Sequence, residues 1–299
     1  MASNLLGYNT HLFGDSIPGW LRDILQAFGT TLTFLDTERA ASIIEKVNAT
    51  DAAVVGLSEV WDDGLAAMIT AGTSPVYPHS YRPRTNNTFP AVLGSGLLLL
   101  SRSPLTDKQF YGFNNLAGVD KYSHKGIAVS TTTLDGKNVT LVLTHTQAPT
   151  DSEGANALHA NVIQLTQTVQ DLTRNTSNPL ILFGDLNIVG EDPNGAPTPQ
   201  YLQSMEIFAE ARLIDAYRTL FPDAKKDPGF TCDAVTNNLI PIFAPQDAGL
   251  EQRLDYFMPV SPGGATATSM KVLTDFKALI QGKNYDLSDH DPLFATFKF

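Results

Sequence analysis

Short apolar runs that end in polar residues recur along the chain. Residues 4–12 (NLLGYNTHL), 51–61 (DAAVVGLSEVW) and 95–105 (SGLLLLSRSPL) are of this kind, and Pro104 ends the third run. Apolar runs of this length, bounded by polar or turn residues, are typical of strands buried in a sheet. We therefore predict core strands at these three places.

Two longer segments show helical spacing instead. Residues 37–49 (TERAASIIEKVNA) place their apolar side chains on one face, and residues 157–174 (ALHANVIQLTQTVQDLTR) have a long amphipathic pattern. The shared face of the first segment consists of Ala40, Ile43, Ile44 and Val47. Apolar residues at this spacing predict a helix in each segment.

The middle of the chain contains a hairpin signal. Residues 125–134 (KGIAVSTTTL) and 137–148 (KNVTLVLTHTQA) flank the dipeptide Asp135-Gly136, which favours a tight turn between two strands. Further apolar runs follow at residues 179–187 (PLILFGDLN), 253–260 (RLDYFMPV) and 291–299 (DPLFATFKF). The stretch 209–249 is richer in turn residues and predicts no clear element.

The order of these elements indicates the fold class. Strands mostly follow strands, with helices interspersed, which is typical of two packed sheets with outer helices, an α/β sandwich. A singly wound nucleotide-binding fold is the competitor, but no Gly-x-Gly-x-x-Gly follows the first strand and no phosphate-loop motif occurs. With no linker, low-complexity tract or internal repeat, we predict one domain over residues 1–299.

Composition narrows the possible partners. The 299 residues are 42% hydrophobic, enough for a sizeable core, and the net charge is −11. This acidity disfavours non-specific nucleic-acid binding, which needs cationic patches, although a nuclease with a local basic groove or a metal ion remains possible. Cys232 is the only cysteine, so no intrachain disulfide can form.

The sequence predicts no membrane span. No apolar run approaches the ~20 residues of a transmembrane helix, and the first residues lack the basic and apolar regions of a signal peptide. We expect a soluble protein, either cytoplasmic or secreted with its signal removed. The sequence does not determine the compartment or the oligomeric state.

Residues suited to metal binding or proton transfer stand at the edges of the predicted strands. They are Asn9, Glu59, His145, Asp185, Asn187, Asp255, Asp289 and His290. Burying such groups singly costs several kcal/mol unless they pair or coordinate something. Their shared placement therefore predicts one polar site.

Taken singly, each of these residues has an ordinary explanation. Gly184-Asp185-Leu186-Asn187 is compatible with a plain Asx-turn, and Ser288-Asp289 with a turn cap. Asp255 beside Arg253 is compatible with a structural ion pair. Glu59 could cap the helical stretch that follows it. None of these explanations predicts the joint arrangement.

The motifs together resemble the endonuclease/exonuclease/phosphatase superfamily, the fold of pancreatic deoxyribonuclease. They occur in that family's order: YNTHLF, GLSEVW, SGLLLLSRSPL, LTHTQA, FGDLNI, RLDYF and LSDHDPL. The resemblance implies a four-layered α/β sandwich with two packed mixed sheets, and a site at one end of them. It also implies a divalent metal, usually magnesium, and hydrolysis of a phosphate ester.

Within the superfamily the chain is most similar to the neutral sphingomyelinases. SEVW, THTQA and GDLNI resemble their motifs, as do Asn115-Leu116 followed by Lys125-Gly126. The chain departs from the bacterial members because it has no obvious aromatic-rich, apolar hairpin of the kind they use to enter membranes. RLDYF also occurs in abasic-site endonucleases, and Phe183 replaces the tryptophan that precedes Gly-Asp in inositol-polyphosphate 5-phosphatases.

This resemblance, together with residue chemistry, suggests a metal site. Oxygen ligands suit Mg²⁺, which takes few protein carboxylates. Glu59 is the first candidate ligand, Asn9 would supply a carbonyl oxygen, and Asp289 would face the metal. Mn²⁺ is an alternative ion.

His290 is the candidate general base, since a histidine can accept a proton from water near neutral pH. Asp255 matches the family position of the carboxylate that orients it. His145 would donate to a phosphate oxygen.

Asp185 and Asn187 lie at i and i+2 of an extended stretch, so they share one face. They would orient the water or leaving group and the phosphate. Lys125 would contact the phosphate, although a surface lysine is an equally ordinary reading.

Three functions compete. The first is a Mg²⁺-dependent phosphodiesterase that acts on a phospholipid head group at a membrane surface and releases a phosphorylated base. The second is a nuclease on DNA or RNA with the same fold, and the third is a catalytically silent binding module. The acidity of the chain and the Lys125-Gly126 segment favour the first.

Overall fold

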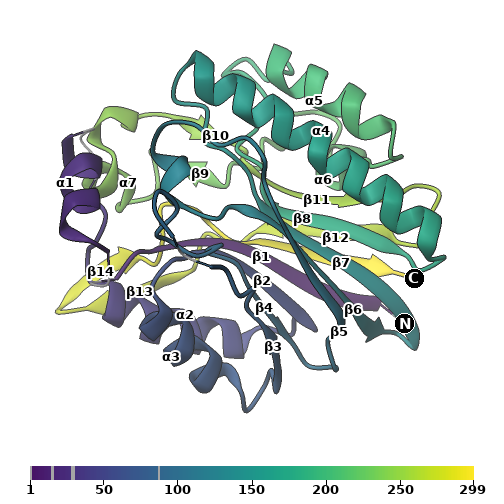
Figure 1. The fold of residues 1–299 in the computed structure, drawn as a ribbon, viewed down its shortest axis with the longest axis horizontal. Coiled ribbons are helices and arrows are strands. Elements are labelled where there is room, and N and C mark those ends of the chain that lie inside the picture. The colour runs from purple at the N-terminus through teal and green to yellow at the C-terminus, as the bar shows by residue number, and fades with distance from the viewer. Residues whose placement is uncertain (1, 15–16, 28–30, 87) are drawn as a thin grey trace.

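Two β-sheets pack face to face at the centre of the molecule (Figure 1). The computed structural model describes residues 2–14, 17–27, 31–86 and 88–299. The first sheet contains, in spatial order, β12 (Thr266–Val272), β15 (Leu293–Lys298), β1 (Ala2–Leu12), β2 (Val54–Val60), β4 (Leu98–Ser101) and β3 (His79–Tyr81). The second contains β11 (Asp255–Pro259), β8 (Leu180–Asp185), β7 (Lys137–His145), β6 (Gly126–Leu134) and β5 (Thr106–Gly112).

Both sheets are mixed. In the first sheet β1 runs parallel to β2 and antiparallel to β15. In the second sheet β7 runs parallel to β8, and the other pairs are antiparallel. Parallel neighbours end at the same edge of a sheet, so β1 with β2, and β7 with β8, present their carboxyl ends together.

Helices cover the outer face of each sheet. Apolar side chains of α2 (Asp36–Ala49) and α3 (Asp63–Thr73) pack on the first sheet, and those of α4 (Ser152–Asn175) and α5 (Pro199–Ala209) pack on the second. Figure 1 shows these pairs on opposite sides of the sandwich. The four-layered α/β sandwich predicted from the sequence is therefore confirmed.

The core between the sheets is filled by apolar residues of both. Phe183 of β8 and Phe257 of β11 stack with their ring centroids 5.1 Å apart and are fully enclosed. Gly56 of β2 lies against Phe183 and Leu143, and a Cβ there would be 2.3 Å from the Phe183 ring. Only glycine lets the two sheets approach this closely.

Smaller elements gather at one end of the sandwich, on the left in Figure 1. They include α1 (Gly19–Ala27), η1 (Gly118–Tyr122), β9 (Cys232–Asp233), α7 (Ile240–Phe243), η2 (Pro245–Asp247), β10 (Glu251–Gln252), β13 (Lys277–Ile280) and β14 (Lys283–Asp286). α6 (Ala216–Leu220) packs near β11 and β12. The carboxyl ends of β1, β2, β7 and β8 lie at the same end, so these elements surround the polar strand ends.

The elements predicted from apolar patterning are all present. The sequence pattern missed α1, α3, β5, β12 and the β13–β14 hairpin, together with smaller elements such as β3 and α7, and the alternation of β5 and β12 is weak because most of their side chains are not buried. Among the described residues, no helix is both long and apolar enough to cross a bilayer.

Candidate active site

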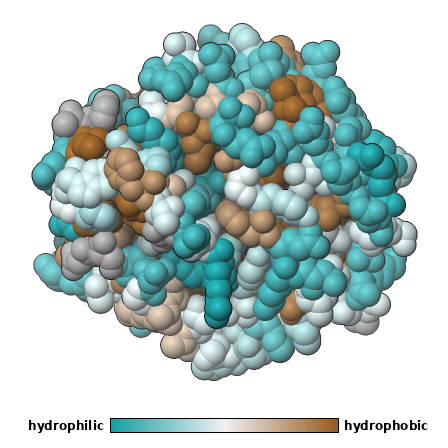
Figure 2. All heavy atoms as spheres, viewed as in Figure 1, coloured by the Kyte–Doolittle hydropathy of each residue, from teal (hydrophilic) through white to brown (hydrophobic). Residues whose placement is uncertain are grey.

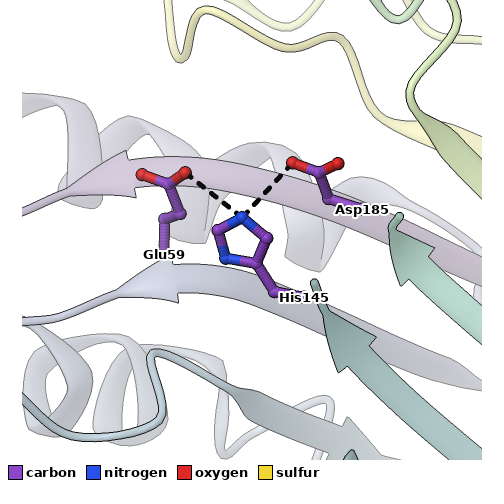
Figure 3. A group of neighbouring side chains, drawn as sticks. All are labelled: Glu59, His145 and Asp185. Atoms are coloured by element: carbon purple, nitrogen blue, oxygen red, sulfur yellow. Dashed lines mark ion pairs between the residues drawn. The ribbon is translucent and has the colours of Figure 1, made fainter. Parts of the chain in front are cut away.

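The carboxyl ends of three strands bring the first cluster together. Glu59 of β2 faces His145 of β7 and Asp185 of β8, so one carboxylate comes from each sheet (Figure 3). The His145 Nε2 atom lies 3.7 Å from Glu59 Oε1 and 3.6 Å from Asp185 Oδ2. Parallel pairing of β7 with β8 sets His145 directly opposite Asp185.

Asn9 of β1 ties the two sheets together at this point. Its Nδ2 atom donates to Glu59 Oε1 at 3.0 Å and to Asp185 Oδ2 at 2.9 Å. Its Oδ1 atom accepts from the His11 backbone N–H at 3.2 Å. The amide nitrogen, rather than the carbonyl expected to hold a metal, thus faces the carboxylates, and a half-turn of the amide would exchange the two.

A second cluster joins β8, β11 and the segment before β15. His290 Nδ1 lies 2.7 Å from Asp255 Oδ2, and both side chains are buried. Asp255 is the register partner of Asp185, which brings His290 Nε2 to 3.9 Å from Asp185 Oδ2. Thr231 fastens the pair, because its hydroxyl accepts from the Asp255 N–H and its carbonyl accepts from the Asp291 N–H.

Burial and charge shift the pKa values of these groups in different directions. Burial lowers the pKa of His145 well below its usual value, and nearby Lys125 lowers it further, so this imidazole is neutral. Burial also opposes the charged form of His290, but the carboxylates of Asp255 and Asp185 outweigh it and raise its pKa well above the usual value. Burial and the Asp255 charge raise the pKa of Asp185 to about 7.

His11 is a further residue of the site that the pattern of strand ends did not predict, although it lies within the YNTHLF motif. Its Nδ1 atom lies 3.2 Å from Asp289 Oδ2 and 3.6 Å from Glu59 Oε2. Its ring stacks on Phe243 with centroids 4.0 Å apart. Burial opposes ionisation of Asp289, but His11 outweighs it and holds the pKa of that carboxyl well below its usual value.

The alternation of side chains along a strand could have predicted this position of His11. Residues at i and i+2 of a strand share a face, so His11 follows Asn9 toward the same site. Trp61 was quoted in SEVW without a role. Its Nε1 atom donates to Glu59 Oε2 at 3.4 Å, and its ring lies 6.1 Å from that of His145.

Lys125 and Asn187 meet at one carbonyl beside His145. Lys125 Nζ donates to the Thr146 carbonyl at 3.0 Å and to Asp120 Oδ2 at 2.9 Å. Asn187 Nδ2 donates to the same carbonyl at 3.2 Å, and its backbone N–H donates to Asp185 Oδ1 at 2.8 Å. Lys125 is therefore buried at the site rather than on the surface.

The backbone is strained at several of these positions. His11, Glu59 and Asn187 have φ values of 45°, 55° and 49°, in the left-handed region that side chains rarely adopt. Gly184 has φ 130°, and a Cβ there would lie 2.1 Å from the Thr144 carbonyl oxygen. This close approach of β8 to β7 sets Asp185 beside His145.

The donor set fits a divalent cation. Two groups have ligand atoms within 4.8 Å of one another: Glu59, His145 and Asp185, and Asp185, Asp255 and His290. Asp289 stands outside both, on the His11 side of Glu59. Within the described part of the chain, no lysine or arginine forms an ion pair with Glu59, Asp185 or Asp289. Converging carboxylates without a basic partner favour an oxygen-preferring cation.

Comparison with known proteins agrees with the fold and the motifs. The model of the endonuclease/exonuclease/phosphatase family matches residues 8–290. A candidate neutral sphingomyelinase of Drosophila melanogaster is 24% identical over 253 residues, which cover 82% of this chain and 52% of that protein. The chain spans about half the length of the curated relatives it matches.

Solved structures share the fold at low identity. Sphingomyelinase C from Streptomyces griseocarneus superposes with a TM-score of 0.73 at 22% identity, covering 99% of both chains. A beta toxin of Staphylococcus aureus with bound magnesium ions gives 0.73 at 18%, covering 99% of both. D. rerio TDP2 complexed with a single-strand DNA product gives 0.70 at 13%, covering 100% of this chain and 99% of that one.

Proposed function

The chain belongs to the endonuclease/exonuclease/phosphatase family, and we propose that within it this protein is a metal-dependent phosphodiesterase that hydrolyses a phospholipid head group. The observation that carries the proposal is the convergence of Glu59, His145 and Asp185 with the Asp255–His290 pair at one end of the sandwich. A carboxylate cluster with a carboxylate-oriented histidine contains the parts that water-driven cleavage of a phosphate ester needs.

Glu59 is the first ligand we assign to the cation, with Asn9 and Asp289 as further ligands. Asp185 is close enough to Glu59 and His145 to share it. Mg²⁺, or Mn²⁺ in its place, would supply positive charge at these residues to neutralise the phosphate oxygens. Three buried atoms of the site, His11 Nε2, His145 Nδ1 and Asp255 Oδ1, have no partner among the described residues, as expected for a site built to receive ligands.

His290 accepts the proton of the attacking water. Its Nδ1 atom is engaged by Asp255, which leaves Nε2 pointing to the side of Asp185. With the carboxylates otherwise unneutralised, the raised pKa keeps His290 protonated at neutral pH. A cation that shared Asp185 would lower the pKa of His290 toward the range useful for a base.

His145 is suited to donate a hydrogen bond to a phosphate oxygen. Its lowered pKa keeps the imidazole neutral, so it carries one N–H donor without repelling the cation. Asn187 and Lys125, held on the Thr146 carbonyl beside it, would orient the phosphate on the same side.

Two observations support a lipid head group as substrate. The matched relatives include a Leptospira interrogans protein named sphingomyelinase C and Staphylococcus aureus proteins named phospholipase C. The net charge of −11 also disfavours a long polyanion. A nuclease is the second candidate, because the fold of a DNA-bound TDP2 is similar.

A substrate screen tests the proposal. The purified chain is incubated with sphingomyelin, lysophospholipids, plasmid DNA and abasic oligonucleotides, each with Mg²⁺ and with chelator. We expect Mg²⁺-dependent release of the phosphorylated base from a lipid. Cleavage of DNA with no release of any head group would establish the nuclease instead.

A further inference from the structure

An exposed aromatic cluster borders the candidate site. Trp20 of α1 lies with its ring 6.2 Å from Phe89 and 5.4 Å from Tyr122 of η1. Trp20 is 40% exposed and Phe89 is 79% exposed. We call these three residues the aromatic patch. Figure 2 shows hydrophobic surface among hydrophilic surface on the left-hand side, where Figure 1 places both α1 and α7.

The patch is joined to the site by a small apolar core of its own. Ile17, Leu21 and Leu32 form this core. Phe13 packs on it from the end of β1, and its ring centroid lies 5.0 Å from His11 and 5.9 Å from Trp61. Since Trp61 contacts Glu59, Phe13 and Trp61 connect this core with the carboxylates.

One exposed cation lies beside the patch. Lys121 is exposed, and its amine lies 5.4 Å from the centroid of the Tyr122 ring. Positive charge therefore stands next to an aromatic ring of the patch, although the chain as a whole carries a net charge of −11.

We propose that the aromatic patch docks this protein on a lipid bilayer with phosphocholine head groups, so that the site opens at head-group level. The proposal rests on the proposed function. Tryptophan and tyrosine favour the interface between water and lipid because each combines an apolar ring with a polar atom. Phe89 would add buried apolar area, while Lys121 would meet lipid phosphates.

The other apolar projection at this end is smaller. The β13–β14 hairpin presents Leu279, which is 75% exposed, but no exposed aromatic residue among the large apolar side chains of the described residues. The sequence shows no aromatic-rich hairpin. The three aromatic residues of the patch come instead from three separate segments of the chain.

Vesicle binding without turnover tests the docking surface. The full chain is sedimented with sphingomyelin–phosphatidylcholine vesicles in chelator, so that hydrolysis does not contribute. We expect Phe89→Asp combined with Trp20→Ala to reduce the vesicle-bound fraction about tenfold or more, because two buried rings are lost. Leu202→Asp on α5, where the side chain is 55% exposed, is the matched control and should bind as the parent chain does.

Tryptophan fluorescence gives a second readout. The chain has two tryptophans, and Trp61 is only 6% exposed, so a blue shift on vesicles should come from Trp20 and vanish in Trp20→Phe. Turnover of a water-soluble phosphocholine diester should stay within about twofold in the patch variants, because they leave the catalytic groups in place.

The outcomes separate the two proposals. Equal vesicle binding by the patch variants and the parent chain, or no binding by the parent, overturns docking even if the soluble diester is hydrolysed. Patch-dependent vesicle binding without hydrolysis of any lipid keeps docking and overturns the proposed function. Patch-dependent binding to an oligonucleotide but not to vesicles would assign the surface to nucleic acid and contradict the inference.

Discussion

Two buried charged clusters, one around Arg253 and one around Asp255, differ in how their carboxylates are paired. Arg253, which is 1% exposed, donates from Nη1 to Asp215 at 2.8 Å and from Nε and Nη2 to Glu191 at 3.1 and 2.7 Å. Arg218 also pairs with Glu191. Each carboxylate of this cluster, which we call the arginine cluster, has a guanidinium partner.

The site around Asp255 lacks such partners. Its carboxylates meet imidazoles, the Asn9 amide, the Trp61 indole and a backbone N–H, and three of its buried polar atoms have no partner in the described part of the chain. The pKa shifts differ accordingly. Burial opposes ionisation in both clusters, but the two arginines outweigh it and lower the pKa of Glu191, whereas the pKa of Asp185 rises to about 7.

The comparison teaches how to tell structural from functional buried charge. Charges that are paired internally contribute to a specific fold and leave no capacity for a ligand. Carboxylates that crowd together destabilise one another until a cation or substrate arrives. The first arrangement should matter for stability and the second for activity, which leads to four predictions.

The largest effect is expected from His290→Ala. Loss of a positioned general base should lower kcat by about 10²–10⁴-fold, with little change in KM, because proton transfer matters only in the transition state. Asp255→Ala should be milder, and the double variant little worse than His290→Ala, since the two act as one unit. Steady-state kinetics and thermal unfolding measure both effects. Simply additive losses would rule out a dyad and move attention to His145.

Arg253→Met should lower stability rather than activity. It leaves Glu191 and Asp215 buried without their main partner, and breaking a buried pair in this way costs about 3–5 kcal/mol of unfolding free energy. Denaturant unfolding measures this loss. Arg174→Met is the matched control, because the Arg174–Asp171 pair is 70% and 69% exposed and should change stability by less than about 1 kcal/mol. An equal effect of both variants would contradict the distinction.

Glu59→Gln should weaken metal binding about 10–100-fold, because it removes one carboxylate charge from the cation site. Excess Mg²⁺ should restore part of the rate, which a titration of activity against Mg²⁺ would show. Full activity at limiting metal would remove Glu59 from the ligand set.

The smallest effect concerns pH and Asp185. Its folded-state pKa of about 7 lies above the usual value for aspartate, so the folded state binds this proton more tightly than the unfolded state does. The associated stability is present below about pH 4 and is lost as pH rises toward 7. In chelator, Asp185→Asn should flatten this decline in the unfolding free energy. An unchanged pH slope would show that Asp185 is not the group responsible.

Glu191 should behave in the opposite sense. Its folded-state pKa is lowered, so its contribution is present above the pKa of the unfolded chain and is lost as pH falls through the folded value. The two clusters therefore favour folding at opposite ends of the acidic range.

Local patterns along the chain were enough to predict the layers of the fold and the candidate residues of the site. Apolar periodicity is a local property, so strands such as 4–12 and 179–187 and the helices at 37–49 and 157–174 could be predicted from it. Polar residues at the ends of those strands had to meet, because strand ends lie at sheet edges. Asp255 and His290 followed from the same reasoning.

The ion-pair partner of each buried charged side chain depends on the tertiary structure. The sequence allowed an ion pair between Arg253 and Asp255. However, β10 ends at Gln252 and β11 begins at Asp255, so Arg253 lies between the two strands and does not share a strand face with Asp255. Its partners, Glu191 and Asp215, are distant in sequence.

The same holds for the contacts of His11 and for the aromatic patch. His11 stacks on Phe243, which is more than 200 residues away in the sequence. Trp20, Phe89 and Tyr122 come from three segments whose local patterns carry no common signal. Local patterning fixes which face of a strand or helix is apolar, but contacts between distant segments depend on how the layers pack, and that packing exists only in the folded chain.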